Sequence, residues 1–404
     1  MKLHQEFPMV PGNPVRRTMA GVTLIETLVG IALGFLVVMV ITQVWGVFES
    51  QRGRTASGST AQETGLIAMA QLNQSIHNAG SGFNAGMFQC AQVTSFYNDG
   101  ASTTSPIPTT TPVPALIVNG TGTTGSDQIR ITWATNIGGA IEATTTAPLY
   151  LQGSNPVLTL DNVKSFTQAP SACPAADSQS HLVVCRRTAN NQCVVSQTTN
   201  INAGALTLTS NSGQALCPYN PTTHCYNTGT CPIGAGDTCY SIGSFVTDTY
   251  SLNANQQLQV VRSVNGISSA ATILADNVVS LQAQYGVAPT GSQTVSCWTN
   301  AAATGNPTCA GDWTPASLTA AQVSRIKALR VVIVVRSPRL EPAAVTPTCT
   351  TTGGIANNGP CAWNDSATNP APQIDLSGDP NWQRYRYRPY QTIIPLRNVI
   401  WANI

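Results

Sequence analysis

The sequence predicts an α+β fold in which a long N-terminal helix packs on an antiparallel β-sheet, with disulfide-stapled loop insertions. An apolar run ending at residue 48 continues into a second helix-like segment, short alternating runs follow, and twelve cysteines lie downstream of the apolar run. These observations divide the chain into an N-terminal segment at 1–21, an anchor half of the helix at 22–50, an amphipathic half at 51–80, and a β-rich region at 81–404.

The apolar run is long enough to cross a membrane. Leu28–Phe48 supplies 21 residues, which as a helix span roughly 32 Å. A secretory signal peptide would have a shorter apolar core followed by an Ala-x-Ala site, and a twin-arginine signal needs the same short core. Lys2, Arg16 and Arg17 outweigh Glu6 on the N-terminal side. The pattern therefore predicts a single-pass protein with a cytoplasmic N-terminus.

Glu26 lies at the edge of this run, where an ionisable side chain is costly unless it sits at headgroup level or has a partner. The stretch "RRTMAGVTLIETLVG" resembles the type IV prepilin signal. That resemblance implies cleavage between Gly21 and Val22 by prepilin peptidase and N-methylation of Val22, although many prepilins carry Phe there. Glu26 becomes the fifth residue of the mature chain.

A physical role for Glu26 follows from that position. In a filament core of bundled apolar helices, the charged amine of an incoming subunit would be costly unless it were paired. A carboxylate on a neighbouring subunit neutralises it. Glu26 is therefore predicted to serve assembly by charge pairing.

The helix is expected to continue beyond the anchor, from about 22 to 78. No proline occurs between Gly21 and Pro106, although three glycines weaken the middle, and Gly80 and Gly82 supply a stop. Helical spacing predicts one packed stripe on the second half, made of Leu66, Met69, Ala70, Asn73 and Ile76.

The remainder reads as β-rich, with strand-like runs such as "DQIRITWAT", "SFVTDTYSL" and "KALRVVIVVRS" separated by Gly, Asn, Pro and Ser. Residues 102–114 are expected to form a loop, and about 165–245 a Cys-rich insertion.

Cysteines on the outward side of an anchor indicate disulfides. Cys297 and Cys309 are twelve residues apart, as are Cys349 and Cys361, and each pair is predicted to be a local disulfide. Seven cysteines remain in the insertion, an odd number, so Cys90 is expected to join them. A zinc site at Cys225, Cys231 and His224 is the alternative, but the chain has no C-x-x-C pair.

Composition argues against an enzyme and against a cofactor. Only 9% of residues are charged, and the chain without residues 1–21 is formally neutral, so no global charge draws it to nucleic acid. Gly120, Gly122 and Gly125 satisfy G-x-G-x-x-G, yet the alternating "DQIRITW" that follows predicts a hairpin turn rather than a nucleotide loop. The four histidines have no recognisable nucleophile motif beside them.

The run "RYRYRPY" lies in a region, 325–398, with a local excess of positive charge. Period-2 alternation predicts buried Tyr385 and Tyr387, with solvated Arg384, Arg386 and Arg388 on the other face. Single-strand DNA binding by these arginines is the alternative.

Several stretches resemble PilW-type minor pilins of type IV pili: "GSDQIRITW", "YSLNANQQLQVVR", "LADNVVSLQAQYGV", "ALRVVIVVRS" and "RYRYRPYQTIIPLRN". The resemblance implies a pilin-like fold and a precursor in the inner membrane. It also implies insertion into an extracellular pilus with other minor and major pilins, through the inner-membrane assembly platform, to prime assembly for twitching motility and adhesion. The aspartate-rich turn of many relatives is "VAPTGSQ" here, so no metal role is carried over. The alternatives are a pseudopilin of type II secretion, which shares the N-terminal signal, and a tip adhesin or DNA receptor.

Overall fold

The computed structural model describes residues 23–83, 85–95, 112–120, 125–136, 141–152, 155–167, 182–198, 200–209 and 233–402. The chain divides into two compact units, Met1–Ala56 and Ser57–Ile404. The structure has the N-terminal apolar helix, mostly antiparallel sheets and disulfides that the sequence predicts, and so confirms the α+β class.

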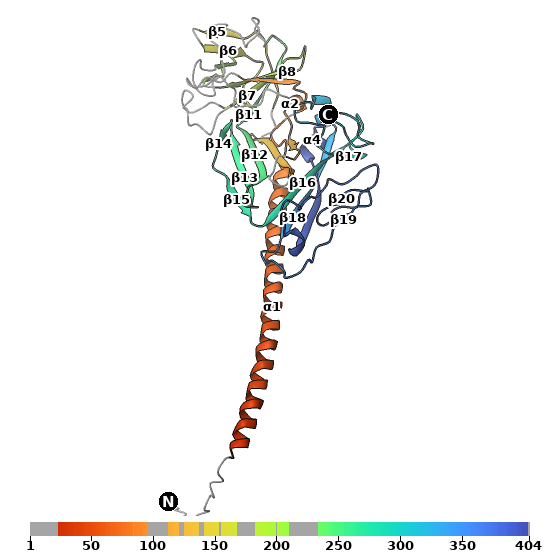
Figure 1. Ribbon diagram of the computed structural model, residues 1–404. Helices are drawn as coiled ribbons and strands as arrows, with labels where there is room; N and C mark the ends of the chain where they lie inside the picture. The colour runs from red at the N-terminus through yellow and green to blue at the C-terminus, as the bar shows by residue number, and fades with distance from the viewer. Residues whose placement is uncertain are drawn as a thin grey trace, which may run out of the picture. The chain divides into compact units, whose positions relative to one another are not determined.

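Helix α1 (Leu24–His77) forms as one uninterrupted element (Figure 1). The expected bounds of about 22–78 agree with it. Gly53, Gly58 and Gly65 do not break the helix. Asn398 holds the C-terminal end of α1, because its Nδ2 donates to His77 O at 3.5 Å and to Ala79 O, just beyond the helix, at 2.9 Å. The contact with His77 O gives a partner to a carbonyl that helix geometry leaves open.

The buried face of α1 in the second unit is not the predicted stripe. The buried positions are small residues on one side, Ala61, Gly65 and Ala68, continuing to Leu72 and Ile76. Of the predicted stripe, Ile76 is buried and Met69 packs partly buried against the same core, while Leu66 is 54% exposed. The predicted stripe was thus wrong at Leu66 and Ala70, because helical spacing alone does not tell which side of a helix meets its partner. This helix instead lies close against the sheet, and close approach requires small side chains.

Gly65 shows how close that approach is, because a Cβ built on it would overlap the ring of Tyr390. We expect Gly65→Ala to lower the free energy of unfolding by about 1–3 kcal/mol, since the ring has to move out of its place. Equilibrium denaturation of the full-length protein in detergent measures this. The control is Gly58→Ala, because a Cβ there meets nothing within 4 Å. That substitution is expected to stabilise by up to about 1 kcal/mol through helix propensity. Equal losses in the two variants would contradict the packing explanation.

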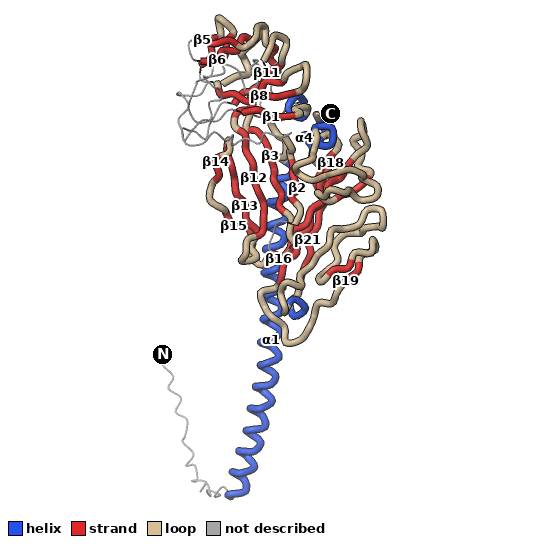
Figure 2. Tube along the Cα trace, turned by 45° about the horizontal axis from the view of Figure 1, so that its top comes forward, coloured by secondary structure: helices blue, strands red, loops and turns tan. Residues whose placement is uncertain are grey.

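Two antiparallel sheets form the body of the second unit (Figure 2). The first is six-stranded, in the order β14 (Ile267–Ser268), β13 (Leu258–Val264), β12 (Phe245–Leu252), β3 (Gln128–Ala134), β2 (Ala115–Val118), with β15 (Thr272–Ala275) beside β13. The second is four-stranded, in the order β17 (Cys297–Thr299), β16 (Val278–Val287), β18 (Ile326–Arg336), β21 (Tyr387–Pro395). One core cluster joins both sheets to α1, and it includes Leu72, Ile131, Leu281 and Leu329. Strands β2 and β3 pair antiparallel, so the hairpin interpretation of the glycine motif is confirmed, with Gly122 outside the described residues.

Two further sheets form a module built around the insertion. One has the order β1 (Gln92–Ser95), β8 (Gln192–Gln197), β7 (Leu182–Arg186), β11 (Thr238–Gly243), β4 (Ala143–Thr144). The other has the order β5 (Tyr150–Gln152), β6 (Asn155–Thr159), β10 (Thr207–Thr209), β9 (Asn200–Asn202). A separate core cluster packs the two against each other. Cys185–Cys239 links β7 to β11, and Cys90–Cys193 links the segment after α2 (Ala85–Phe88) to β8. The pairing of Cys90 with the insertion is therefore confirmed.

The module continues the strands of the body. Only Ser244 separates β11 from β12, and the chain beyond β3 pairs with the same stretch, because Asn136 N donates to Ile242 O at 3.2 Å and Thr135 N to Ser244 O at 3.0 Å. The part of the module between β3 and β12 thus starts and ends on two adjacent strands of the first sheet, whereas β1 precedes β2 in the chain.

Short elements cover the remaining surfaces. They are α3 (Ala320–Val323), the hairpin of β19 (Cys349–Thr350) and β20 (Ala356–Asn357), the 3₁₀ turn η1 (Trp382–Arg384) and α4 (Arg397–Trp401). Residues of the 362–382 stretch pack on the outer face of the second sheet, where Ile374, Leu376 and Trp382 contact Val332 and Val334.

Candidate assembly site

The N-terminal part of α1 exposes apolar side chains on every face. By length and composition, Leu24–Gly53 is a helix of 30 residues that could cross a membrane. Within its own unit none of that span is buried, and Ile25, Phe35 and Trp45 are each about 70% exposed. Such a surface is unstable in water and needs a lipid or protein environment.

Glu26 lies in the first turn of α1. Thr23 caps this turn, because the Glu26 N–H donates to Thr23 Oγ1 at 3.3 Å and to Thr23 O at 3.0 Å. The pair has the spacing of a capping box, and an acid in the first turn also suits the helix dipole. Glu26 thus has a local role in starting the helix, and its charge pairing with a neighbouring subunit stays a prediction. Gly21 and Val22 lie outside the described residues.

The three candidate arginines have protein partners. Arg386 Nε forms an ion pair with Glu341 Oε1 at 2.9 Å, and Arg384 Nε donates to Glu341 O at 2.8 Å. Arg388 Nη1 donates to Gln62 Oε1 on α1 at 2.8 Å.

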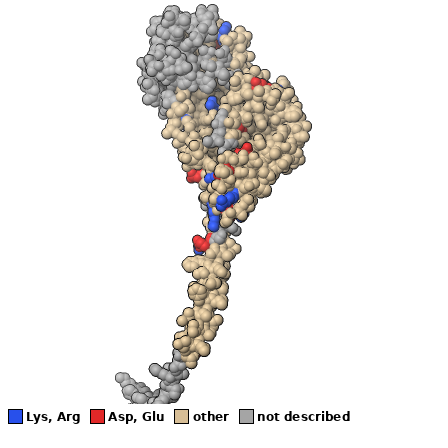
Figure 3. All heavy atoms as spheres, in the orientation of Figure 1, with Lys and Arg blue, Asp and Glu red and all other residues tan. Residues whose placement is uncertain are grey.

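The predicted alternation of buried tyrosines and solvated arginines in "RYRYRPY" is found only from Tyr385 onward. Arg386 and Arg388 are exposed between half-buried tyrosines, whereas Arg384 belongs to η1 and is itself half-buried. The contacts give the arginines a structural role: Arg388 joins β21 to α1, and Arg384 and Arg386 hold the segment that contains Glu341. Figure 3 shows that most of the face it displays belongs to uncharged residues.

Ser126 and Asp127, just before β3, join the two body sheets. Asp127 N donates to Leu281 O at 2.8 Å, Leu281 N donates to Ser126 Oγ at 3.3 Å, and Ala283 N donates to Asp127 Oδ2 at 2.8 Å. Side-chain oxygens here take the place of strand carbonyls along β16. Asp127 is almost fully buried, and burial raises its pKa to about 7, although the backbone donors of Ala283 and Gly120 oppose that shift.

This carboxyl should make stability depend on pH. Its folded pKa lies above its ordinary value, so its stabilising contribution is fully present below about pH 4 and is lost as pH rises through about 7. We expect the free energy of unfolding to fall by about 3 kcal/mol more between pH 4.5 and pH 7.5 in the wild type than in Asp127→Asn, which cannot titrate. Denaturant titrations at the two pH values measure the difference. Equal pH dependence in both proteins would show that Asp127 does not titrate in this range.

Arg330 is a buried cation that the sequence analysis did not single out. It lies mid-strand in β18, where its guanidinium is 5.1 Å from the ring of Trp298 and 4.8 Å from that of Trp363. Nε donates to Gln284 Oε1 at 2.6 Å, and Nη2 donates to Pro370 O at 3.2 Å. Burial lowers the pKa of Arg330 to about 10. A charged residue inside the otherwise apolar run "ALRVVIVV" was the signal that could have found it.

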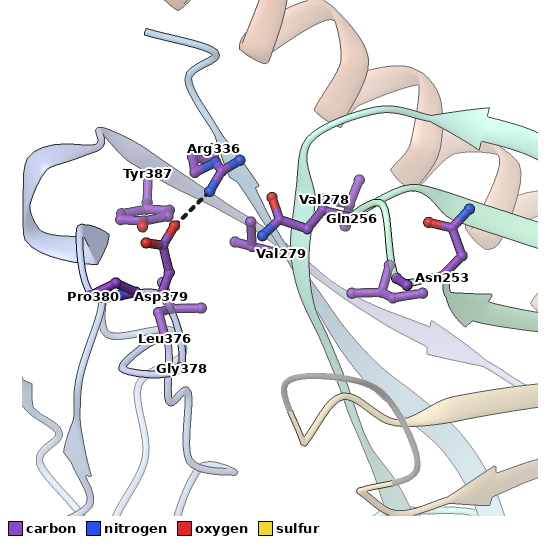
Figure 4. Close-up of a pocket in the computed structure, with 12 residues that line it drawn as sticks. Asn253, Gln256, Val278, Val279, Arg336, Leu376, Gly378, Asp379, Pro380 and Tyr387 are labelled. Carbon is purple, nitrogen blue, oxygen red and sulfur yellow. Dashed lines mark hydrogen bonds and ion pairs between the residues drawn. The ribbon is translucent and has the colours of Figure 1, made fainter. Parts of the chain in front are cut away.

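A cavity of about 390 Å³ lies beside the other arginine of β18, Arg336 (Figure 4). Arg336 Nη1 pairs with Asp379 Oδ2 at 2.9 Å, and its guanidinium is 4.2 Å from the Tyr385 ring. Val278 and Gln256 form the opposite wall. The guanidinium of Arg336 thus already has a carboxylate and an aromatic partner. Its ion pair with Asp379 holds the 376–380 loop against β18.

The two local cysteine pairs are bonded in the structure, Cys297–Cys309 beside β17 and Cys349–Cys361 around the β19–β20 hairpin. Among the described cysteines none is free. The residues of the alternative zinc site, His224, Cys225 and Cys231, lie outside the described residues. Within the described part of the chain no group of three or more His, Cys, Asp or Glu side chains could hold a metal ion.

Comparison with known protein families gives a match in the C-terminal part of the chain. Residues 240–398 match the family model described as type IV pilus-assembly protein W. Neither the search of curated proteins nor the search of solved structures found a match. The matched region starts in β11 and ends in α4, so it contains most of the first sheet and the whole second sheet. It also contains every stretch on which the resemblance was based except "GSDQIRITW".

Proposed function

We propose that this chain, which belongs to the PilW-type family of type IV pilus proteins over residues 240–398, is a minor pilin. On this proposal it is made as a membrane-anchored precursor with a cytoplasmic N-terminus and cleaved after Gly21 by prepilin peptidase. It is then methylated at Val22 and inserted near the pilus tip with other minor and major pilins, where it helps to prime assembly.

One observation carries the proposal further than the family does: α1 is apolar and exposed on all sides at its start, and the same helix ends packed in a folded body. A helix that serves only as a membrane anchor does not need to continue into a domain core. A subunit whose apolar helix passes from the bilayer into a bundle with the helices of other pilins is expected to have such a helix.

The N-terminus is tested by intact mass spectrometry of the protein extracted from membranes. A chain that starts at Val22 and carries one added methyl group is expected. A chain that starts at Met1, or after residue 50, would contradict the prepilin assignment.

The place of action is tested by in-frame deletion. Loss of surface pili and of twitching, restored by the gene in trans, supports a pilus subunit. Normal piliation with loss of type II secretion would instead identify a pseudopilin, which shares the N-terminal signal.

A further inference from the structure

A second cavity, of about 580 Å³, opens at the rim of the second sheet. Gly378 lines both this cavity and the cavity beside Arg336 that Figure 4 shows, so the two adjoin at that residue. The polar side chains on its wall are those of Asn119, Gln282, Asn300, Gln373, Asp375 and Ser377. Its volume lies within the range of small-molecule sites.

One residue that lines this cavity, Gln282, has a buried side-chain amide. Gln282 is only 5% exposed, and its Nε2 donates to Gly125 O at 3.0 Å. This bond holds the side chain through its nitrogen and leaves the acceptor Oε1 for a ligand.

Asp375, another residue that lines the cavity, is also held in place by hydrogen bonds. Three donors converge on Asp375 Oδ1: Asn358 Nδ2 at 3.0 Å, Ser377 N at 3.0 Å and Ser377 Oγ at 2.6 Å. They leave Oδ2 as an acceptor.

Two further amides are each held by one atom. Gln373 Nε2 donates to Ala356 O at 2.9 Å, which leaves its Oε1, and Asn300 Oδ1 accepts from Gln284, which leaves Nδ2 as a donor. The cavity thus presents three acceptors and one donor whose positions are set by bonds to the body.

The chemistry of this lining selects one class of ligand. The described lining residues include no Lys, Arg or His, which argues against phosphate and acidic ligands, and no large apolar side chain, which argues against acyl and aromatic groups. Hydroxyl groups both donate and accept, and therefore match fixed amide and carboxylate oxygens beside an amide N–H. We propose that this cavity binds a neutral oligosaccharide, with Gln282, Gln373, Asp375 and Asn300 contacting its hydroxyls.

The proposal is independent of whether the chain acts in a pilus or a pseudopilus. Because none of the residues that the structure describes around the cavity offers an aromatic ring for a sugar to stack on, recognition rests on hydrogen bonds, and millimolar affinity is expected.

The test is saturation-transfer NMR on the full-length protein in a zwitterionic detergent, since sugar-based detergents would compete. The probes are lactose, maltose, cellobiose and N-acetyllactosamine, with glucuronic acid and glucose 6-phosphate as charged comparisons. Transfer to at least one neutral disaccharide and to neither charged sugar is expected. The disaccharide preferred separates a glycan of animal cells from a glucan.

Two variants on the exposed rim, Asp375→Asn and Gln373→Ala, should each weaken binding about fivefold to tenfold without changing the melting temperature. The matched control is Asp276→Asn, an exposed carboxylate outside the cavity that accepts from Gln257 Nε2 at 2.7 Å, and it should bind like the wild type. Absence of transfer to all four disaccharides, or transfer unchanged in both rim variants, would overturn the proposal. So would binding abolished by EDTA, which would show that a cation rather than the side chains holds the sugar.

Discussion

Glu26→Gln should yield a chain that accumulates in the membrane, cleaved and methylated, yet is absent from sheared pili. If the Glu26 carboxylate neutralises the amine of a neighbouring subunit in the filament core, the amide leaves that amine unpaired in a low-dielectric environment, at a cost of several kcal/mol. A cost of that size would remove nearly all incorporation. Piliation should also fall if this subunit primes assembly.

The structure makes Gln the right replacement. Thr23 and Glu26 have capping-box spacing, with the Glu26 N–H bonded to Thr23 Oγ1. Gln serves at the third helical position of such a box as Glu does. The variant therefore keeps the helix start and nearly the same volume, and loses only the charge. Cleavage depends on the leader and Gly21, so it should persist.

Two comparisons isolate the charge. Glu26→Asp keeps a carboxylate on a shorter side chain and should restore part of the incorporation. Glu49→Gln removes the other acid of the exposed part of α1, and should enter pili normally. Quantitative immunoblots of sheared pili against membranes give the ratio for each variant. Wild-type incorporation of Glu26→Gln would refute charge pairing and leave helix capping as the function of this residue.

Removal of the long-range disulfide Cys90–Cys193 should destabilise the protein more than removal of a local one. The bond spans 103 residues, whereas Cys297–Cys309 spans 12. In the chain-entropy model the loss of stability is about 4.7 kcal/mol for the longer loop and about 3 kcal/mol for the shorter. The alanine pairs Cys90→Ala/Cys193→Ala and Cys297→Ala/Cys309→Ala are compared by denaturant unfolding without reductant.

Non-reducing peptide mapping provides the control that the remaining bonds are native in both variants. The four cysteines compared are all buried in the structure, so the loss of packing is similar and the difference reports loop length. A larger loss for the local pair would show that native-state contacts, rather than the unfolded chain, account for the stabilisation. Free thiols at Cys297, Cys309, Cys349 or Cys361 in exported protein would show that the local pairs do not form.

Local patterns in the sequence predicted the elements of the fold but not the faces that meet. The long helix followed from the absence of proline, and the β2–β3 hairpin from alternation after Gly125. The packed face of α1 did not follow, because it depends on Tyr390, more than three hundred residues away, which lies against Gly65. The pattern of residues within the helix contains no information about a packing partner as distant in sequence as Tyr390.

The same limit applies to the candidate site. Glu26 could be singled out from its neighbours in sequence, since a carboxylate in an apolar run is conspicuous. Asp127 and Arg330 could not be assigned roles in this way. Their properties come from burial against β16 and between two tryptophans, and both arise only on folding. The alternation of arginine and tyrosine could be recognised in the sequence. The turn η1, which takes Arg384 out of the strand, could not be predicted from it.

The attachment of the insertion module has a consequence for how such a protein can change. The chain leaves the first sheet after Asn136 and returns at Ile242, and these two residues are joined by a backbone hydrogen bond. A change in the length of the chain between these two residues therefore leaves the register of β3 and β12 as it is. It does not leave the segment after α1 as it is, because β1 and Cys90 precede β2 in the chain and pair with β8 and Cys193 inside the changed stretch. Evolution of the insertion is thus coupled to that segment, and uncoupled from the two body sheets and their joint at Asp127.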